Sequence, residues 1–124
     1  MDINTVNIIT LAYLGDAIYE VYIRETLIKK NIAKVEDLTK QATTYVSAKG
    51  QANILTYLLE NNLLTEEEIE IVKRGRNYKR SSHPKHTDII TYKLSTGFES
   101  LIGYLYLSKN LDRLQEILNY IEVK

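Results

Sequence analysis

The chain has 124 residues, and its 16 Lys and Arg are balanced by 16 Asp and Glu, so the formal net charge is zero. This length fits one domain with a core of its own, and the balanced average charge predicts no polyanionic partner. The sequence contains no cysteine, which excludes thiolate metal sites, disulfides and cysteine nucleophiles and fits a reducing compartment. The uncharged run of residues 3–15 is too short and too polar to span a bilayer, and no signal peptide is recognisable. We expect a soluble cytoplasmic protein with a single domain, residues 1–124.

Apolar residues recur at helical spacing along the whole chain. There is a single proline, Pro84, and no Asn-Gly or Asp-Gly dipeptide of the kind that closes a hairpin. Thr65 followed by three glutamates has the sequence of a capping box, and Asn110 is suited to begin the last helix. The fold class is therefore all-α, and a break in the first helix near residues 13–15 stays open. The predicted helices cover residues 4–29, 35–46, 48–61, 66–75, 88–107 and 111–122.

One segment departs from this pattern. KRGRNYKRSSHPKH, residues 73–86, holds six Lys and Arg and no acidic residue, so the other 110 residues carry a net charge of −6. We call it the basic segment. Its charge, with Gly75 and Pro84, predicts an exposed loop that binds phosphate groups. The alternative is a solvated loop without a ligand, which many charged runs are.

Two carboxylates interrupt apolar helical runs. Asp16 lies within LAYLGDAIYE (residues 11–20) and Glu99 within FESLIGYLYL (residues 98–107). Burying an unpaired carboxylate costs several kcal/mol or shifts its pKa until it is neutral. Two buried acids so far apart in the chain are most simply explained if they meet at one cation, so a metal site is the first hypothesis.

Asp16 has simpler alternatives, either a helix N-cap or a partner for Arg24 or Lys29. Against a cap, the apolar periodicity continues on both sides of Asp16. Glu20 lies one turn later on the same face. It would either share a divalent cation with Asp16 or face solvent and pair with Arg24, and both alternatives stay open.

Glu99 has no basic residue three or four positions away, so it lacks a local ion pair. Gly97 and Gly103 lie on either side of it, and a glycine in a helix interior costs about 1 kcal/mol. That cost is expected where another backbone or a ligand approaches closely. The pattern therefore predicts a close contact at this part of the helix.

The remaining polar residues give weaker signals. His83 and His86 are spaced like zinc ligands, but Pro84 lies between them and no third ligand is near, so we interpret them as phosphate or base contacts or as inert. Tyr78 is the one tyrosine within the basic segment, where stacking or a phosphate contact is expected. The sequence has no phosphate-binding glycine motif, nucleotide fingerprint or serine–histidine triad pattern.

Several segments, taken in order, resemble the ribonuclease III family, and most closely its Mini-ribonuclease III members. The first looks like the signature helix of the family, with Gly15 and Asp16 in place. The resemblance covers nearly the whole chain. The segments are LAYLGDAIYEVYIRE (11–25), VSAKGQA (46–52), KRGRN (73–77), HPKHTD (83–88) and STGFESLIGYLYL (95–107).

The resemblance implies an all-helical homodimeric endoribonuclease of the ribonuclease III fold, which cuts double-stranded RNA with Mg²⁺ and leaves 5′-phosphate and 3′-hydroxyl ends. Asp16 and Glu99 match the catalytic aspartate and glutamate of the family and would bind the metal, with Glu20 or waters completing its shell. The signature helix, with Tyr13 and Leu14, would form the dimer interface. The usual role of these enzymes is to mature both ends of precursor 23S ribosomal RNA during ribosome biogenesis.

Full-length ribonuclease III carries a separate domain that binds double-stranded RNA, and a chain of this length has no room for one. The basic segment is expected to take its place, because cations that contact phosphates supply affinity for RNA. The expected RNA contacts are Lys73, Arg74, Arg76, Asn77, Tyr78, Lys79, Arg80, His83, Lys85 and His86.

Two acids of ordinary ribonuclease III enzymes are missing. Ala12 stands four residues before Asp16, and Thr96 three residues before Glu99, where those enzymes have a glutamate and an aspartate. Mini-type members share such losses, so we expect one Mg²⁺ rather than two. The same losses support an alternative function, a non-catalytic helical module that binds double-stranded RNA on ribosomes. A purely structural helical protein is a third alternative, but it leaves the basic segment unexplained.

Overall fold

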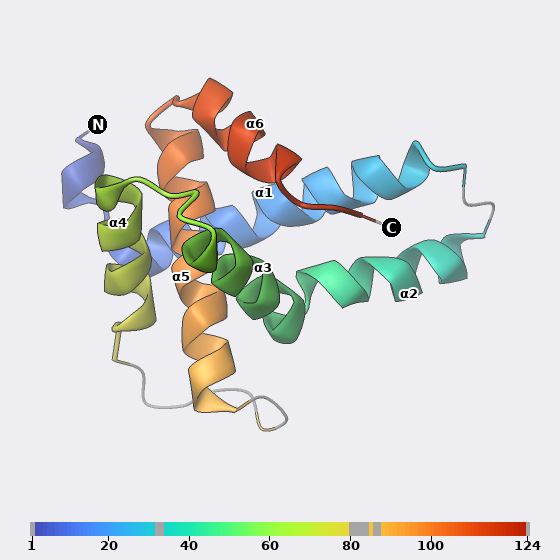
Figure 1. The fold of residues 1–124 in the computed structure, drawn as a ribbon, viewed down its shortest axis with the longest axis horizontal. Coiled ribbons are helices and arrows are strands. Elements are labelled where there is room, and N and C mark those ends of the chain that lie inside the picture. Colours follow the sequence, from blue (N-terminus) through green and yellow to red (C-terminus); the bar gives the residue numbers. More distant parts are fainter. Residues whose placement is uncertain (1, 32–33, 80–84, 86–87, 124) are drawn as a thin grey trace.

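The computed structural model describes residues 2–31, 34–79, 85 and 88–123. Within these residues the chain is all-helical, as the sequence predicts (Figure 1). No helix in this part of the chain is long and apolar enough to cross a membrane. A short 3-10 helix precedes the α-helices, and the bounds are η1 Ile3–Thr5, α1 Ile8–Ile28, α2 Val35–Val46, α3 Ala48–Glu60, α4 Glu66–Arg76, α5 Ile89–Leu107 and α6 Leu111–Asn119.

Helix α1 is unbroken, so the break left open near residues 13–15 does not occur. It begins later than predicted because Asn7 is its N-cap: the Asn7 side-chain oxygen accepts a hydrogen bond from the Ile9 amide at 2.9 Å. Of residues 4–7, which were predicted to be helical, 4 and 5 belong instead to η1, which Asp2 caps. The other helix limits agree with the prediction to within three residues.

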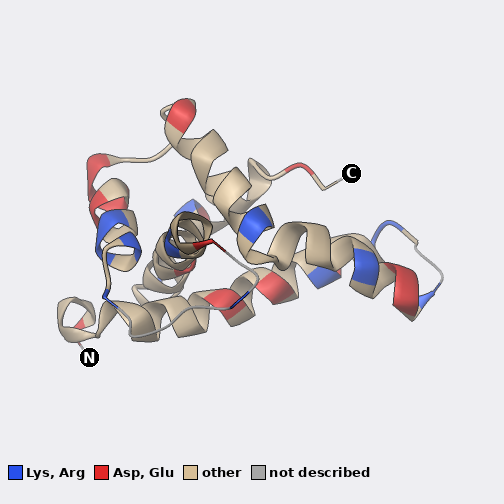
Figure 2. Cartoon of the chain, turned by 90° about the horizontal axis from the view of Figure 1, so that it is seen from below, with Lys and Arg blue, Asp and Glu red and all other residues tan. Residues whose placement is uncertain are grey.

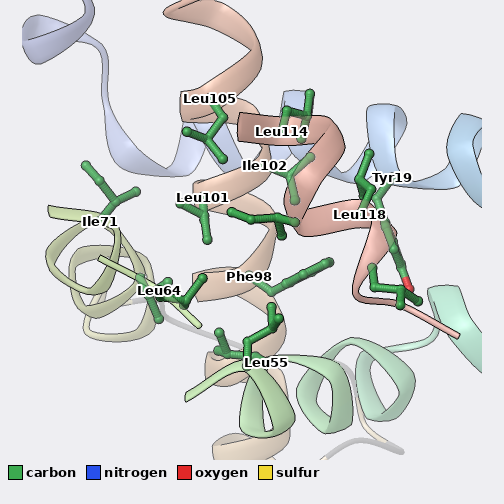
Figure 3. Packing of buried hydrophobic residues seen from close by; sticks show 14 of the residues in the cluster. Tyr19, Leu55, Leu64, Ile71, Phe98, Leu101, Ile102, Leu105, Leu114 and Leu118 are labelled. Atoms are coloured by element: carbon green, nitrogen blue, oxygen red, sulfur yellow. The ribbon is translucent and has the colours of Figure 1, made fainter. Parts of the chain in front are cut away.

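Helix α5 is the centre of the fold and contacts α1, α3, α4 and α6. Figure 3 shows its buried side chains, Phe98 among them, surrounded by apolar residues of the other helices. The ring of Tyr19 on α1 meets Phe98 edge-on, with 4.9 Å between ring centroids and 84° between planes. Burial raises the pKa of the Tyr19 hydroxyl. Glu99, which follows Phe98, is thus carried on the helix that packs against four others.

Helices α1 and α5 cross with their backbones in contact. A Cβ atom added to Gly15 would lie 1.8 Å from the main-chain oxygen of Glu99, and one added to Gly103 would lie 1.9 Å from that of Leu11. No side chain fits at either position unless the helices move apart. The close approach predicted from Gly103 is therefore confirmed.

Helix α4 packs on α5 through a second pair of glycines. A Cβ on Gly97 would lie 2.8 Å from the carbonyl oxygen of Val72, and a Cβ on Gly75 would lie 2.4 Å from Ser100 Oγ. The close approach predicted from Gly97 is thus also confirmed. This contact lies at the end of α4, where the basic segment begins.

The beginning of α4 is joined to α6 by a buried ion pair. Thr65 and Glu68 form the predicted capping box, with backbone-to-side-chain hydrogen bonds of 2.9 and 3.1 Å. Arg113 of α6 donates at 2.7 Å to each carboxylate oxygen of Glu68 and at 2.7 Å to the Leu63 carbonyl. Burial alone would raise the pKa of Glu68, but the hydrogen bonds from Arg113 and Thr65 outweigh it and lower that pKa.

Candidate active site

The crossing of α1 and α5 brings Asp16 and Glu99 to one cleft. This open cleft has a volume of about 510 Å³, and Thr10, Tyr13 and Tyr92 are among the other residues that line it. The cause is local, because Asp16 directly follows the glycine that touches the main chain of Glu99. Two acids separated by most of the chain therefore share one solvent-accessible space.

The expectation that both acids are buried is wrong for Asp16, which is exposed, while Glu99 is partly buried. The buried stripe of α1 passes through Ala12, Gly15 and Tyr19, and Asp16 lies beside this stripe, facing the cleft. The cost of burial thus gives no argument for a metal at Asp16. The argument that remains is the shared cleft.

The local alternatives for Asp16 are not seen. It lies in the middle of α1 and is no N-cap, and the two cations weighed as its partners bind other acids. Arg24 pairs with Glu20 at 3.2 Å and Lys29 pairs with Glu25 at 3.1 Å. Of the two alternatives for Glu20, the structure therefore shows the ion pair with Arg24, its i+4 residue. It lines a groove between α1 and α2 and is not among the residues of the Asp16–Glu99 cleft.

Gln51 of α3 is a site residue that sequence reasoning missed. Its side chain is 1% exposed, and its Nε2 donates to Glu99 Oε2 at 3.3 Å and to the Val46 carbonyl at 3.1 Å. Ser47 ends α2 and begins α3, with its Oγ accepting from the Gly50 amide at 3.1 Å, and this tight corner brings the start of α3 to Glu99. The available signal was that Gln51 lies inside a segment resembling the family.

The two positions where acids are missing differ: Ala12 lines the Asp16–Glu99 cleft, whereas Thr96 does not. Ala12 and Thr96 are both buried, and Thr96 Oγ1 donates to the Tyr92 carbonyl at 3.1 Å within α5. Neither position supplies a carboxylate to the cleft.

Asp16 and Glu99 fit an ion that needs few protein ligands. Mg²⁺ keeps several waters and is typically held by one or two carboxylates together with substrate phosphates. Among the described residues there is no group of three or more His, Cys, Asp or Glu that could hold a metal ion. Two carboxylates lining an open cleft match the donor set that Mg²⁺ prefers, with room for waters and a phosphate.

The basic segment begins inside a helix, as the predicted helix over residues 66–75 implies, and the structure extends this helix by one residue to Arg76. Lys73, Arg74 and Arg76 belong to the last turn of α4, where cations are favoured by the helix dipole, while residues 66–68 place three glutamates in its first turn. Figure 2 shows α4 with acids at one end and cations at the other. Lys73 and Arg74 are exposed, and Lys73 Nζ lies 3.8 Å from Glu70 Oε1.

The segment continues along the surface. Asn77 is the C-cap of α4 and accepts a hydrogen bond from Arg76 Nε at 3.3 Å. Tyr78 is half-buried and packs against the core, whereas Lys79 and Lys85 are exposed. Four exposed cations are thus available to a ligand in the described part of this segment. The other expected RNA contacts, Arg80, His83 and His86, lie outside the described residues.

An apolar stripe follows the outer face of α1. Tyr13 is 83% exposed. Val21 and Ile28 are 63% and 62% exposed and lie on the same side of the helix, about two and about four turns after Tyr13. Leu14 beside them is half-buried. A groove of about 250 Å³ between α1 and α2 continues the stripe to Val35, which is 75% exposed. A row of exposed apolar side chains is typical of a protein-contact surface.

Comparison with known proteins gives consistent matches. The family model for the ribonuclease III domain matches residues 9–110. The Mini-ribonuclease 3 of Streptococcus pneumoniae is 47% identical over 97% of this chain and 94% of its own length, and that of Brevibacillus brevis is 51% identical over 94% and 85%. The crystal structure of a protein from Fusobacterium nucleatum superposes with a TM-score of 0.83 at 34% identity, covering 96% of this chain and 93% of the other.

Proposed function

The chain belongs to the ribonuclease III family of endoribonucleases, and on that premise we propose that it cuts double-stranded RNA in a Mg²⁺-dependent reaction at Asp16 and Glu99. The observation that carries the proposal is the single open cleft that these two carboxylates line. Hydrolysis would leave 5′-phosphate and 3′-hydroxyl ends, as the family resemblance implies.

The two carboxylates would hold the metal ion and fix its position relative to the RNA. Mg²⁺, when bound, activates water and offsets the negative charge that develops on the phosphate and the leaving oxygen. Asp16 and Glu99 contribute the fixed negative charge that retains the ion, and the contact between Gly15 and the Glu99 main chain sets the spacing of the two residues along the crossing. Because water is the nucleophile, no serine, cysteine or histidine nucleophile is required.

The exposed cations of the basic segment would bind the RNA backbone. A-form RNA has a deep, narrow major groove that side chains do not read, so phosphate and 2′-hydroxyl contacts are expected to dominate. Lys73, Arg74, Lys79 and Lys85 are exposed at and beyond the end of α4 and suit this role. We further propose that residues 1–124 act as a single catalytic domain, with the basic segment supplying RNA affinity.

We propose that the active enzyme is a homodimer. One site cuts one strand, so a duplex cut on both strands needs two sites, and a two-fold axis supplies them with matched spacing. The apolar stripe formed by Tyr13, Val21 and Ile28 supports α1 as the interface. Leu14, half-buried beside Tyr13, would belong to the same contact.

The substrate that we propose is precursor 23S ribosomal RNA, whose two ends would be trimmed in the cytoplasm during ribosome biogenesis. The support is the similarity to Mini-ribonuclease 3 relatives over nearly the full length of the chain.

The decisive experiment incubates the purified protein with a duplex RNA in the presence of Mg²⁺ or of a chelator. We expect cuts on both strands with Mg²⁺ and none with the chelator. A gel shift without cleavage under either condition would contradict the enzyme and favour the alternative, a non-catalytic module that binds double-stranded RNA. If the protein neither binds nor cuts the duplex, the third alternative, a purely structural helical protein, is favoured.

A further inference from the structure

Gln51 has an environment that packing alone does not explain. It is one of the few polar side chains buried in the described part of the chain, at 1% exposure, and it reaches across from α3 to α5. Its Nε2 donates two hydrogen bonds, to the last carbonyl of α2 at Val46 and to the Glu99 carboxylate. The amide therefore links the α2–α3 corner to the proposed catalytic glutamate.

The orientation of this amide is set by its neighbours. The Val46 carbonyl and the Glu99 carboxylate are both acceptors, so only the NH₂ end of Gln51 can face them. Rotating the amide by half a turn would place its oxygen against two other oxygens. The Gln51 side chain is thus held in one orientation, with one N–H directed at Glu99 Oε2.

Keeping an amide at this position costs stability. Gln51 Oε1 is buried and accepts no hydrogen bond from the residues that the structure describes. A buried acceptor without a partner is unfavourable, and an apolar side chain of similar shape avoids that loss. The amide is consequently better explained by what it does to Glu99 than by core packing.

We propose that Gln51 is a positioning residue for Glu99: its N–H fixes the plane of the carboxylate so that Glu99 and Asp16 present their oxygens to the same metal ion. This inference rests on the function proposed above. Partners that orient a metal-binding side chain are typically worth about 10- to 100-fold in metal affinity or activity. Because the hydrogen bond is long, at 3.3 Å, we expect an effect near the lower limit.

The test compares Gln51→Met with Gln115→Met. Methionine keeps the length and shape of glutamine and removes the donor. Gln115 is exposed on α6, and its amide donates to Asn119 on the same helix, so its variant undergoes the same chemical change at a residue that does not line the cleft. Mn²⁺ alone, titrated in the absence of RNA and followed by electron paramagnetic resonance, reports metal binding directly. The Mg²⁺ dependence of cleavage separates an increase in KM for the metal from a fall in kcat.

We expect Gln51→Met to bind Mn²⁺ about tenfold more weakly and to require about tenfold more Mg²⁺ for half-maximal cleavage. Its melting temperature should fall, because the Val46 carbonyl also loses its donor. Gln115→Met should match the wild type in Mn²⁺ affinity, in the Mg²⁺ concentration for half-maximal cleavage and in melting temperature. Should Gln51→Met fail to fold, Gln51→Asn serves instead: it keeps an amide but is one methylene too short to reach both acceptors, so it should also weaken metal binding.

Wild-type Mn²⁺ affinity in a folded Gln51 variant would overturn the positioning role. The absence of Mn²⁺ binding by the wild-type protein would overturn it as well. Failure of the proposed function gives a different result, in which Mn²⁺ binding depends on Gln51 but duplex RNA stays uncut. The two proposals are therefore separable.

Discussion

The α-carbon of Gly15 lies directly against the main-chain carbonyl of Glu99, so close that a methyl group at Gly15 would come within 1.8 Å of the carbonyl oxygen. Asp16 follows Gly15 in the chain, and the Glu99 side chain lines the same cleft as Asp16. A contact between two backbones, rather than a packed side chain, thus determines how near the main chains that carry the two carboxylates come.

Gly15→Ala should destabilise the protein strongly. The added methyl group meets backbone atoms, which cannot rotate away, so α1 and α5 must separate at a cost of about 3 kcal/mol or more. Gly75→Ala is the matched comparison, because its methyl group overlaps less severely: it meets Ser100 Oγ at 2.4 Å and the Gly97 α-carbon at 3.0 Å, and alanine is the better helix former. Urea unfolding should rank Gly15→Ala as clearly less stable. Equal stability of the two variants would contradict this.

Asp16→Asn and Glu99→Gln should each keep the fold and RNA binding but lose Mg²⁺-dependent cleavage. Removing one of two charged metal ligands forfeits about 4 kcal/mol of transition-state stabilisation, which corresponds to about a thousandfold in rate. Single-turnover cleavage of a duplex RNA measures the loss. Glu60→Gln and Asp112→Asn make the same chemical changes at exposed positions outside the cleft and should cut at the wild-type rate. Near-normal cleavage by either cleft variant would refute the assignment.

The double variant Arg74→Ala, Lys79→Ala should bind duplex RNA more weakly and with a flatter dependence on salt. Each cation that contacts a phosphate contributes about one unit to the slope of log affinity against log salt concentration, so the slope should fall by about two. Fluorescence anisotropy across a salt series measures it. Lys34→Ala, Lys40→Ala removes two exposed cations near and on α2 and is the control. An unchanged slope in the first variant would remove the basic segment from the RNA interface.

Val21→Asp should convert the proposed dimer to a monomer. Burying an unpaired carboxylate in an apolar contact costs several kcal/mol, and each 1.4 kcal/mol is a tenfold loss of affinity, so dimerisation should weaken by about a thousandfold or more. Light scattering at micromolar concentration reports the mass. Leu111→Asp introduces the same charge at a residue of α6 that is 53% exposed, and it should leave the mass unchanged. A monomeric wild-type protein would contradict the dimer itself.

Glu68→Gln should lower the free energy of unfolding at neutral pH by about 3 kcal/mol, because it breaks a buried ion pair with Arg113. The folded-state pKa of Glu68 lies below its ordinary value of 4.5, so its ionised form stabilises the fold above pH 4.5, and this stabilisation is lost as the pH falls through the folded-state pKa. Thermal unfolding of both proteins between pH 7 and pH 3 should therefore show the difference shrinking on the acid side. Glu66→Gln, exposed in the same helical turn, should have little effect at any pH. A difference that stays constant with pH would exclude the ion pair as its cause.

The helices were predictable because their signals are local. The Thr65 capping box and the apolar periodicity place most of the helix ends within one residue of where the structure has them. The start of α1 was missed because Asn7 was not recognised as its N-cap. The helical start of the basic segment was predicted by the helix over residues 66–75, and cations at Lys73 and Arg74 suit the end of a helix.

The site was harder to predict, because its geometry is tertiary. Glycines flanking Glu99 indicated a close approach, but which helix approached could not be read from spacing alone. The exposure of Asp16 depends on where the buried stripe of α1 meets α5, which no window of the sequence contains. Gln51 reaches Glu99 only because α2 and α3 meet in a tight corner, so its role has no local signature.

The glycine crossing also bears on how the protein fails when it is heated. Because backbone contact rather than side-chain packing sets the distance between the two backbones that carry Asp16 and Glu99, gradual loosening of the surrounding core leaves that distance unaltered until α1 and α5 come apart. Thermal inactivation should accordingly be abrupt and should coincide with the melting of the helices, with no temperature range in which the protein is folded but inactive.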